Sequence, residues 1–377
     1  MKPIICHLCN FSPETAGTFV DAIVSLAAYS RNHLHLETLC FFPHTARERK
    51  WLQIFEREKI HYAFVPRKRS VAAEVRRFLK GFDPLIFHSH FSMYDLCPPL
   101  LKFFYSRSKI VWHYHNPTPS TLSQRLKDTV RFQLIARPFG ASYIAVGDGV
   151  YRSLIDAGVR KDKLFLVHNG VDTQRFVAND DRRTRARLAL NIADDKTTTF
   201  LMLGWDPVRK GVDIFVKAAR DVIGGGLRRV RFLIIGDLNT KEFLAKTPEC
   251  SQLDGFLNVI DPTDDFPSLL SAVDVLVSSS RSEGLSYAVA EALAAKKLAI
   301  CSDIPGVREA YERVDGVWLF PSEDSVRLAE FMRRAATLPV EKQNKLGESN
   351  REYVLANYSL DRWAEKIGEI YCQLLQV

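Results

Sequence analysis

Residues 199–235 read TFLMLGWDPVRKGVDIFVKAARDVIGGGLRRVRFLII and contain one complete strand–helix–strand unit. Two short apolar runs, Thr199–Leu203 and Val230–Ile235, are typical of buried strands, and Val212–Val222 between them has the periodicity of an amphipathic helix. Gly224-Gly225-Gly226 is interpreted as the loop that joins this helix to the second strand. A helix that connects two buried strands in this way predicts a parallel sheet covered by helices.

The same alternation extends along the whole chain. In the first half we expect strands at Pro3–Cys9, His35–Phe42, Leu85–His88, Lys109–Tyr114 and Tyr143–Val146, and helices at Thr18–Tyr29 and Ala72–Lys80. In the second half we expect further strands at Val273–Val277, Leu298–Cys301 and Gly316–Phe320, and a helix at Ser286–Ala295. Two such series predict two doubly wound α/β domains that bind ligands in the cleft between them, outside the carboxyl ends of their strands. The junction is expected at His168-Asn169-Gly170-Val171-Asp172.

Composition excludes several classes of protein. The chain has 377 residues, of which 46% are hydrophobic and 25% charged, a balance that excludes a disordered, collagen-like or coiled-coil protein. No uncharged apolar run reaches the ~18 residues of a membrane-spanning helix. The apolar run in the opening MKPIICHLCNFSPETAG is too short for a signal peptide. Seven cysteines, an odd number, favour reduced thiols in a cytoplasmic protein.

The charge is distributed unevenly between the two halves. Residues 1–170 hold 24 Lys and Arg against 13 Asp and Glu, whereas residues 171–377 hold 28 against 31. The densest basic stretch contains Arg67, Lys68, Arg69, Arg76, Arg77 and Lys80, interleaved with Val71, Val75, Phe78 and Leu79. A basic amphipathic segment of this kind favours an anionic membrane surface as a partner, and a solvated helix face is the alternative. No nucleic-acid motif accompanies the charge, so we expect no nucleic-acid partner.

Two glutamates flank an expected helix start in the second half. Glu283-Gly284-Leu285-Ser286 follows the strand Val273–Val277, and Glu291 stands eight residues after Glu283. Ser286 is a natural N-cap residue, and free backbone N–H groups at such a position suit the anionic part of a ligand. The two carboxylates could act as a hydrolytic acid and base, or accept hydrogen bonds from sugar hydroxyls. On spacing alone, two ordinary surface residues remain the alternative.

A short turn with two adjacent cations follows the strand Thr199–Leu203. The sequence Gly204-Trp205-Asp206-Pro207-Val208-Arg209-Lys210-Gly211 places Arg209 and Lys210 near a strand's carboxyl end. Such a pair suits a diphosphate, and a solvated turn is the alternative.

Histidines and one glycine mark the strand ends of the first half. His88-Ser89-His90 and His113-Tyr114-His115 could offer a four-histidine metal site, although a single histidine serving the cleft is the favoured interpretation. Cys6 and Cys9 form a C-x-x-C within an expected buried strand, which disfavours a zinc or redox role. Gly17, between the first strand and its helix, would let the backbone approach a phosphate or sugar.

Taken in order, these features resemble the family-4 retaining glycosyltransferases of the GT-B fold. The resemblance covers the segment Ala141–Val146, the link Leu164–Phe176, the turn Met202–Gly211, the strand Phe232–Gly236, the E-x7-E signature in Ser282–Ala294, the loop Ser302–Glu309 and the terminal stretch Tyr358–Leu375. It implies a first domain over residues 1–170 that binds acceptor, with residues 358–377 packing back on it. A nucleotide-sugar domain over residues 171–357 is implied for the rest.

The resemblance also implies roles for individual residues. Glu283 would contact the donor sugar, Glu291 the ribose, and Lys210 the diphosphate, with Gly284, Leu285 and Ser286 helping to hold the donor. Gly17 would approach the phosphates and His115 the reacting carbon, with no metal or other cofactor. Trp205 replaces the family's usual arginine, so Arg209 would supply that charge, or Trp205 would stack on a base or sugar. Leu285-Ser286 replaces the usual aromatic-glycine pair.

We therefore expect a retaining, metal-independent glycosyltransferase that moves a sugar from a UDP- or GDP-linked donor to a hydroxyl of a glycan or lipid-linked acceptor. Cell-surface polysaccharide or glycolipid synthesis is the expected setting, with the enzyme in the cytoplasm and peripheral on the inner face of the membrane. Three alternatives remain open: a nucleotide-sugar epimerase or hydrolase of the same fold, a non-catalytic sugar-nucleotide-binding subunit, and a metal-dependent hydrolase built on the four histidines.

Overall fold

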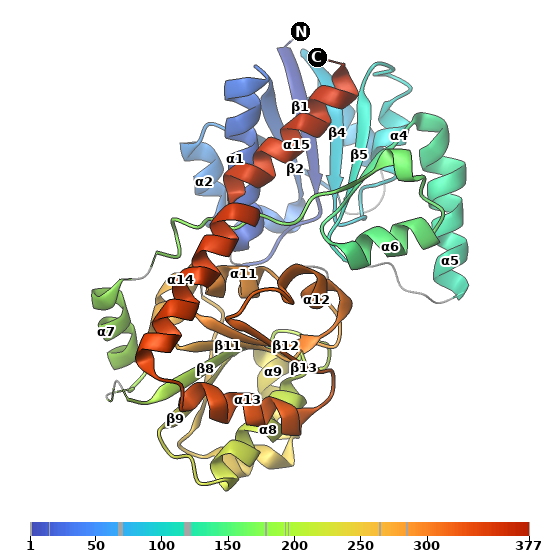
Figure 1. Cartoon of the computed structure of the whole chain (residues 1–377). Helices are drawn as coiled ribbons and strands as arrows, with labels where there is room; N and C mark the ends of the chain where they lie inside the picture. Colours follow the sequence, from blue (N-terminus) through green and yellow to red (C-terminus); the bar gives the residue numbers. More distant parts are fainter. Residues whose placement is uncertain are drawn as a thin grey trace. The chain divides into compact units, whose positions relative to one another are not determined.

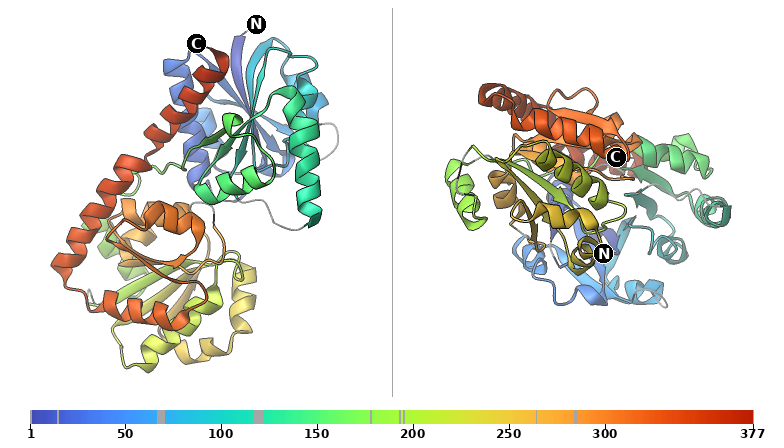
Figure 2. Two further views of the ribbon diagram at one scale, coloured as in Figure 1. Left: turned by 45° about the vertical axis from the view of Figure 1, so that its right-hand side comes forward. Right: turned by 90° about the horizontal axis from the view of Figure 1, so that it is seen from below.

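The computed structural model describes residues 2–14, 16–66, 71–116, 122–177, 179–192, 194, 196–263, 265–283 and 286–376. The chain divides into two compact units, one formed by Met1–Gly170 with Leu360–Val377 and the other by Val171–Ser359. Each unit is a parallel sheet with helices on both of its faces (Figure 1, Figure 2). The predicted two-domain α/β architecture is confirmed.

The first unit contains a seven-stranded sheet in the order β3-β2-β1-β4-β5-β6-β7. The strands are β1 (Lys2–Cys9), β2 (Glu37–Pro43), β3 (His61–Val65), β4 (Phe82–His90), β5 (Lys109–Tyr114), β6 (Ser142–Ala145) and β7 (Leu164–Leu166). The helices are α1 (Gly17–His33), α2 (Leu52–Arg57), α3 (Val71–Phe78), α4 (Cys97–Leu101), α5 (Leu122–Thr129), α6 (Asp148–Asp156) and α15 (Leu360–Leu375). Short 3-10 turns η1 (His44–Ala46), η3 (Arg137–Phe139) and η4 (Lys161–Lys163) and the π-helical segment η2 (Val130–Ala136) complete it.

Alternation along β1 separates the two cores of the first unit. Ile4 packs with side chains of α3 and α4, whereas Ile5 packs on the opposite face with α1 and α15. The C-terminal helix α15 lies beside α1 and buries Trp363 and Ile367 in that second core (Figure 1). The last helix of the chain is therefore part of the first unit, because its apolar face completes the cover of that sheet.

The second unit contains a six-stranded sheet in the order β10-β9-β8-β11-β12-β13. The strands are β8 (Thr198–Leu203), β9 (Val230–Ile235), β10 (Leu257–Ile260), β11 (Val275–Ser278), β12 (Leu298–Asp303) and β13 (Val317–Pro321). The helices are α7 (Asp180–Ala189), α8 (Val212–Gly224), α9 (Leu238–Ala245), α10 (Phe266–Ala272), α11 (Tyr287–Ala294), α12 (Pro305–Tyr311), α13 (Ser325–Ala336) and α14 (Val340–Asn357), with the 3-10 turn η5 (Pro248–Leu253). Phe200 and Leu201 of β8 point into separate cores, one with α8 and α13 and one with α10 and α11.

Three strands, β3, β7 and β10, were absent from the sequence-based expectation. All three form an edge of their sheet. An edge strand is covered less completely than a central one, and its sequence need not be a continuous apolar run. His61-Tyr62 and Leu257-Asn258 therefore mix polar and apolar residues, and β7 has only three residues.

Two further findings concern the cysteines and the membrane. All seven cysteines are free, and burial raises the pKa of the Cys6 and Cys9 thiols well above its usual value. Within the part of the chain that the structure describes, no helix is both long and apolar enough to cross a membrane.

Candidate active site

In the second unit, the candidate site begins at the turn between β8 and α8. Gly211 caps the start of α8 with a φ of +67°, in the left-handed region that favours glycine. A Cβ at this position would collide with the carbonyl oxygen of Ser279. Glycine is therefore required twice over, by its backbone conformation and by the close approach of a neighbouring loop.

That neighbouring loop, residues 279–283 after β11, is hydrogen-bonded to the turn. The Arg281 backbone N–H donates to the Arg209 carbonyl over 2.8 Å, and Ser279 Oγ donates to the Gly211 carbonyl over 2.9 Å. The Arg281 guanidinium binds both carboxylate oxygens of Asp213 at 3.0 and 2.9 Å, and it also binds Glu323 at 2.6 and 2.8 Å. A bidentate guanidinium–carboxylate pair adds a defined geometry to the electrostatic attraction, so the two loops are held in a fixed position relative to each other.

The held loops bring Arg209, Lys210 and Glu283 together. Lys210 Nζ donates a short hydrogen bond to Glu283 Oε1, which also accepts one from Ser280 Oγ over 2.9 Å. Arg209 Nη1 lies 3.5 Å from Glu283 Oε2, and its Nε donates to Asp206 over 2.8 Å. The Lys210 and Glu283 side chains are each only 10% exposed. Because charges interact more strongly where water is largely excluded, this cluster is suited to hold an anionic ligand.

Trp205 stands beside these cations and is half exposed. Its ring centroid lies 4.7 Å from Arg209 Cζ and 4.9 Å from Lys210 Nζ, the range of a cation–π interaction. Arg209 therefore places its charge beside Glu283, next to the tryptophan that stands at the start of the turn.

The remaining residues predicted for this site lie at the start of α11. Ser286 occupies the N-cap position and is buried, although its hydroxyl accepts no hydrogen bond from the helix. Glu291 is buried on the same helix. Desolvation and the nearby Glu291 carboxylate raise the pKa of Tyr287. Gly284 and Leu285, also predicted to hold the donor, lie outside the described residues.

In the first unit, a row of histidines lies at the carboxyl ends of the central strands. His7 of β1 pairs in register with His88 of β4, and His90 pairs with His113 of β5. His7 Nδ1 lies 3.1 Å from His90 Nε2, and His90 Nδ1 lies 3.4 Å from His115 Nε2. This places the predicted His115 at one end of a hydrogen-bonded chain of three rings.

Burial keeps these imidazoles neutral. It lowers the pKa of His7 and of His115 to about 3, and it lowers the pKa of His90 well below the usual value. A neutral ring carries one N–H, so a ring that donates through one nitrogen accepts through the other. If the hydrogen bonds are donated from His7 toward His115, all three rings carry their proton on Nδ1. If they are donated in the opposite direction, all three carry it on Nε2. The tautomer of His115 is thereby coupled to those of two buried neighbours.

The histidines also supply the groups that could hold a metal ion. One ring nitrogen from each of His7, His88 and His90 lies within 4.8 Å of the others, and so does one from each of His90, His113 and His115. The cluster includes His7 in addition to the four histidines considered from the sequence.

Gly17 is the first residue of α1 and has a φ of +55°. A Cβ there would meet no atom within 4 Å, so its conformation alone favours glycine.

Both groups of residues lie where the strand order of their sheet reverses. In the second unit the chain runs from β8 to β9 on one side and later returns to β11 on the other, and the cation–glutamate cluster follows β8 and β11. In the first unit the reversal lies between β1 and β4, the strands that carry His7 and His90. Such reversals are the usual ligand sites of doubly wound sheets.

Comparison with protein-family models assigns both units. Residues 24–175 match the model described as Glycosyltransferase Family 4, and residues 197–337 match the model described as Glycosyl transferases group 1. The chain is a member of glycosyltransferase family 4.

Two curated proteins of similar sequence carry glycosyltransferase names. An alpha-D-kanosaminyltransferase from Streptomyces kanamyceticus is 24% identical over 208 residues, which make up 54% of this chain and 52% of that protein. An uncharacterized glycosyltransferase from Methanocaldococcus jannaschii is 24% identical over 178 residues, 44% of this chain and 43% of that protein. The family-4 chain thus spans about half the length of these relatives.

Solved structures share the fold over nearly the whole chain. Anabaena HepE in complex with UDP has a TM-score of 0.81 at 16% identity, and the match covers 99% of this chain and 100% of HepE. Sucrose-phosphate synthase from Thermosynechococcus elongatus has a TM-score of 0.79 at 15% identity, with 100% of each chain covered. The predicted GT-B architecture of this family-4 protein is confirmed.

Several residues of the site were not identified as such from the sequence of this family-4 chain. Ser280 and Arg281 belong to the polar run Ser278-Ser279-Ser280-Arg281-Ser282 at the end of β11, and His7 lies within an apolar run. The serine run at a strand's carboxyl end was the available signal for Ser280. His7 gave none, because its partners come from strands far away in the sequence.

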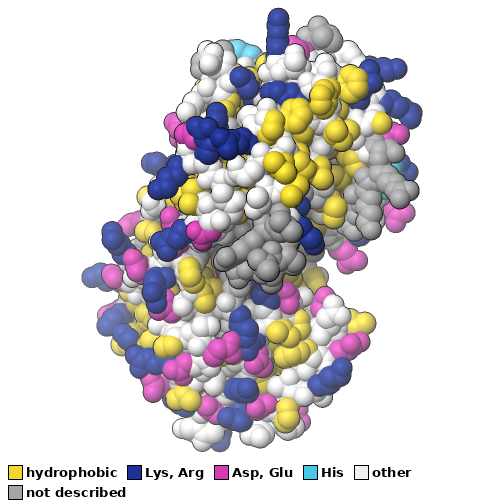
Figure 3. Space-filling model, turned by 90° about the vertical axis from the view of Figure 1, so that its right-hand side faces the viewer, with side chains coloured by type: hydrophobic (Ala, Val, Ile, Leu, Met, Phe, Trp, Pro, Cys, Tyr) yellow, Lys and Arg dark blue, Asp and Glu magenta, His cyan; other side chains and the backbone are white. Residues whose placement is uncertain are grey.

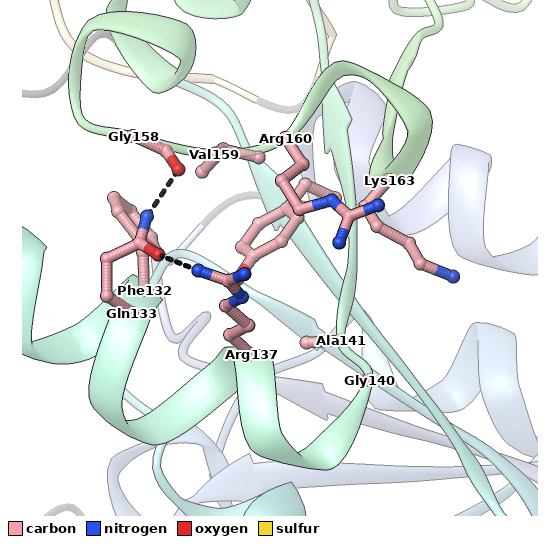
Figure 4. A pocket seen from close by; sticks show the side chains of 10 residues that line it. Phe132, Gln133, Arg137, Gly140, Ala141, Gly158, Val159, Arg160 and Lys163 are labelled. Carbon is pink, nitrogen blue, oxygen red and sulfur yellow. Dashed lines mark hydrogen bonds between the residues drawn. The ribbon is translucent and has the colours of Figure 1, made fainter.

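Two cavities lie apart from these residues. The first, about 70 Å³ in volume, is lined in part by Gln133, Arg137, Arg160 and Lys163 (Figure 4). The second, about 490 Å³, lies beside the glycine-rich loop after α8 and is lined in part by Arg220, Arg228 and Arg333. Neither is lined by a residue that the resemblance to family 4 assigned to donor or acceptor.

Proposed function

We propose that this family-4 protein transfers a sugar from a nucleoside-diphosphate donor to an acceptor hydroxyl. The observation that carries the proposal is the placement of Arg209 and Lys210 beside Glu283 where β8 and β11 end. Two cations there can neutralise a diphosphate while a carboxylate accepts hydrogen bonds from sugar hydroxyls. A hydrolase pair built on Glu283 and Glu291 is less favoured, because the Glu283 carboxylate is engaged by Lys210 and lies 3.5 Å from Arg209.

Each residue of the second unit takes a role in donor binding. Lys210 and Arg209 move from Glu283 toward the phosphates when donor binds, and they stabilise the charge that grows as the bond from sugar to phosphate breaks. Glu283 then contacts the sugar, and Glu291 the ribose. Ser286, together with Gly284 and Leu285, contributes to the donor site at the start of α11, where backbone N–H groups favour anions.

The first unit contributes His115 and Gly17. A neutral His115, whose tautomer is coupled to that of His90, can form a hydrogen bond to the donor sugar without adding charge near the reacting carbon. Gly17 leaves the backbone at the start of α1 open to the phosphates.

The donor class and the stereochemistry are the finer parts of the proposal. HepE has been solved with UDP and with UDP-glucose, which favours UDP over GDP as the base-bearing part of the donor. We propose retention of the anomeric configuration, as in the resemblance stated above. We also propose that no metal or other cofactor takes part, because Arg209 and Lys210 supply the positive charge. The acceptor would be a hydroxyl of a glycan or lipid-linked molecule bound by the first unit, in cell-surface polysaccharide or glycolipid synthesis.

Thermal unfolding with a panel of nucleoside diphosphates and nucleotide sugars, each with and without chelator, tests the donor site. A ligand present at 100 times its dissociation constant stabilises a protein by about 2.7 kcal/mol, which is readily measured. We expect a shift with UDP and UDP-sugars that chelator leaves unchanged and that Lys210→Met diminishes. Lys241→Met, which removes a surface lysine paired with Asp261, is the matched control and should keep the shift.

Turnover then separates the alternatives. With an acceptor fraction, a transferase should release UDP and form a product whose anomeric configuration, measured by NMR coupling, matches the donor's. Release of free sugar at full rate without acceptor would indicate a hydrolase or epimerase instead. Donor binding without turnover on any acceptor fraction would indicate a binding subunit, and loss of activity with chelator would indicate a metal enzyme built on the histidines.

A further inference from the structure

Large apolar side chains are concentrated on one face of the first unit. Among the described residues, 17 large hydrophobic side chains are exposed, and eight of them fall between Phe78 and Leu134. Phe103 is 72% exposed and Leu134 69% exposed. In Figure 3, which faces the side where α4 and α5 lie in Figure 1, hydrophobic side chains gather on the first unit with Lys and Arg side chains around them. Exposed apolar groups collected in this way mark an interaction surface.

The sequence around α4 explains why these side chains are exposed. Met93, Leu96, Leu100 and Phe103 are exposed and recur every three or four residues, whereas Tyr94, Cys97 and Leu101 alternate with them and are buried in the core with β1 and β4. The segment is thus apolar on both sides, with one side packed on the sheet and the other left to solvent. We call Met93, Leu96, Leu100, Phe103, Phe104 and Leu134 the apolar surface.

Positive charge surrounds the apolar surface. Residues 71–140 hold ten Lys and Arg against four Asp and Glu, and two of those acids, Asp95 and Asp128, are buried. Arg76 of α3 lies over the Phe104 ring at 3.7 Å, so a cation and an exposed aromatic ring are held together at the margin. The strongly basic residues 67–69, predicted to meet a membrane, lie outside the described residues, but Arg76, Arg77 and Lys80 are exposed.

The smaller cavity adds to this positive margin. Phe139 of η3 packs against Phe103, with ring centroids 5.5 Å apart, and Arg137 at the other end of η3 lines the cavity. Lys163 and Arg160 also line it (Figure 4), although Arg160 is paired with both carboxylate oxygens of Asp162 at 2.9 and 2.8 Å. A cation-lined hollow next to exposed aromatic side chains suits the phosphate of a phospholipid headgroup.

We infer that the apolar surface docks the first unit onto a membrane that contains anionic phospholipid. Apolar side chains enter the boundary between headgroups and acyl chains, while the surrounding Lys and Arg contact the headgroup phosphates. The anionic membrane fits better than a protein partner because apolar side chains and an excess of cations lie together on this face. The apolar side chains match the acyl-chain region of a leaflet, and the cations match its layer of headgroup phosphates. The inference does not rest on the transferase reaction, since binding is measured without donor or acceptor.

Sedimentation with phospholipid vesicles tests it. We expect the protein to bind vesicles of phosphatidylcholine with about one third phosphatidylglycerol, and to bind pure phosphatidylcholine at least fivefold more weakly, since each basic residue near an anionic surface contributes about fivefold. Leu100→Ser/Phe103→Ser should weaken binding at least tenfold, because burial of one large side chain is worth about that factor or more. Both substituted residues are exposed, so the protein should still fold, and a lower melting temperature would report only the loss of the Phe103–Phe139 ring contact.

Matched variants distinguish binding through the apolar surface from nonspecific hydrophobic binding to vesicles. Leu238→Ser/Val340→Ser removes two side chains of the second unit that are 69% and 70% exposed, and it should leave vesicle binding unchanged. Arg76→Gln/Arg77→Gln should reduce binding to anionic vesicles and leave the weak binding to phosphatidylcholine as it was. Absence of vesicle binding by the unsubstituted protein, or binding that survives Leu100→Ser/Phe103→Ser, would overturn the inference. Concentration-dependent dimers lost in that variant would assign the surface to a second copy instead.

Discussion

The two sheets of this protein are wound alike but end in different chemistry. Where the strand order reverses in the first unit, the side chains are buried histidines that stay neutral and bond to one another. At the equivalent place in the second unit they are two cations and a carboxylate joined by ion pairs. Fold alone therefore does not set the chemistry of such a site; the residues that follow each strand do.

The two sites also differ in how they are held. The histidines are fixed by register, because β1, β4 and β5 present them on one face of the sheet. The charged cluster stands on two loops, and its geometry depends on Gly211, Ser279 and Arg281. We expect the first site to respond mainly to pH and the second to loss of charge or of loop packing.

The largest effect is expected from removing charge in the second unit. Lys210→Met keeps the length of the side chain and deletes its charge, so stabilisation of the leaving diphosphate should be lost. Loss of one such group lowers turnover by about 10²–10³-fold. Steady-state kinetics with a UDP-sugar should show most of the loss in kcat. Lys241→Met, on exposed α9, should leave both constants unchanged, and an equal loss there would show that net charge matters and position does not.

The next effect concerns how the charged loops are held. Gly211→Ala combines a left-handed φ with a collision against the Ser279 backbone, and it should lower the free energy of unfolding by about 3 kcal/mol. Gly226→Ala is the matched control, since its φ is +90° and its Cβ would meet nothing within 4 Å. It should cost about 1 kcal/mol, from backbone conformation only. Urea denaturation measures both, and equal losses would contradict the collision.

How much could be predicted from the sequence differs between these same regions. Central strands such as Lys109–Tyr114 and Val230–Ile235 were predicted to the residue, because continuous apolar runs are what burial on both faces requires. The edge strands β3, β7 and β10 were not predicted, whereas the edge strand β13 was expected at Gly316–Phe320. His7 was missed as well, because its place in the cluster depends on its register with His88. Arg209, Lys210 and Glu283 could be named because each lies in the turn after an expected strand, within a segment that resembles a motif of family 4. The role of Arg281 could not, since Asp213 and Glu323 reach it only in the folded unit.

A smaller effect should appear in the acid stability of the first unit. Burial lowers the pKa of His7 from 6.5 to about 3, so the unfolded chain binds a proton there at pH 5.5 while the folded chain does not. Stability is therefore full above pH 6.5 and falls as the pH decreases toward 3. His7 alone should cost about 1.4 kcal/mol on going from pH 7.5 to 5.5.

His7→Gln removes the group that binds the proton in the unfolded chain and leaves an amide that can form a hydrogen bond with His90. Urea denaturation at the two pH values should show the pH dependence reduced by the same amount. His61→Gln, at an exposed position at the start of β3, should leave the difference as it is in the unsubstituted protein. An unchanged difference in His7→Gln would mean that His7 is already protonated in the folded chain, and the shared tautomer of the histidine row would then be wrong.

The smallest effect is expected at Trp205, and it decides what that half-exposed ring is for. If the ring only holds Arg209 and Lys210 in place, Trp205→Ala should remove about 1 kcal/mol, seen as a fall of about fivefold in kcat/KM through a lower kcat and a higher KM for donor. Trp205→Phe, which keeps an aromatic face for the cations, should recover most of it. If the donor's base or sugar stacks on the ring instead, the rise in KM should differ between UDP-sugars and GDP-sugars, because the two bases offer different areas to the same surface. An equal rise in KM for both donors would mean that Trp205 only positions Arg209 and Lys210. A rise in KM that differs between the donors would make Trp205 a determinant of donor specificity.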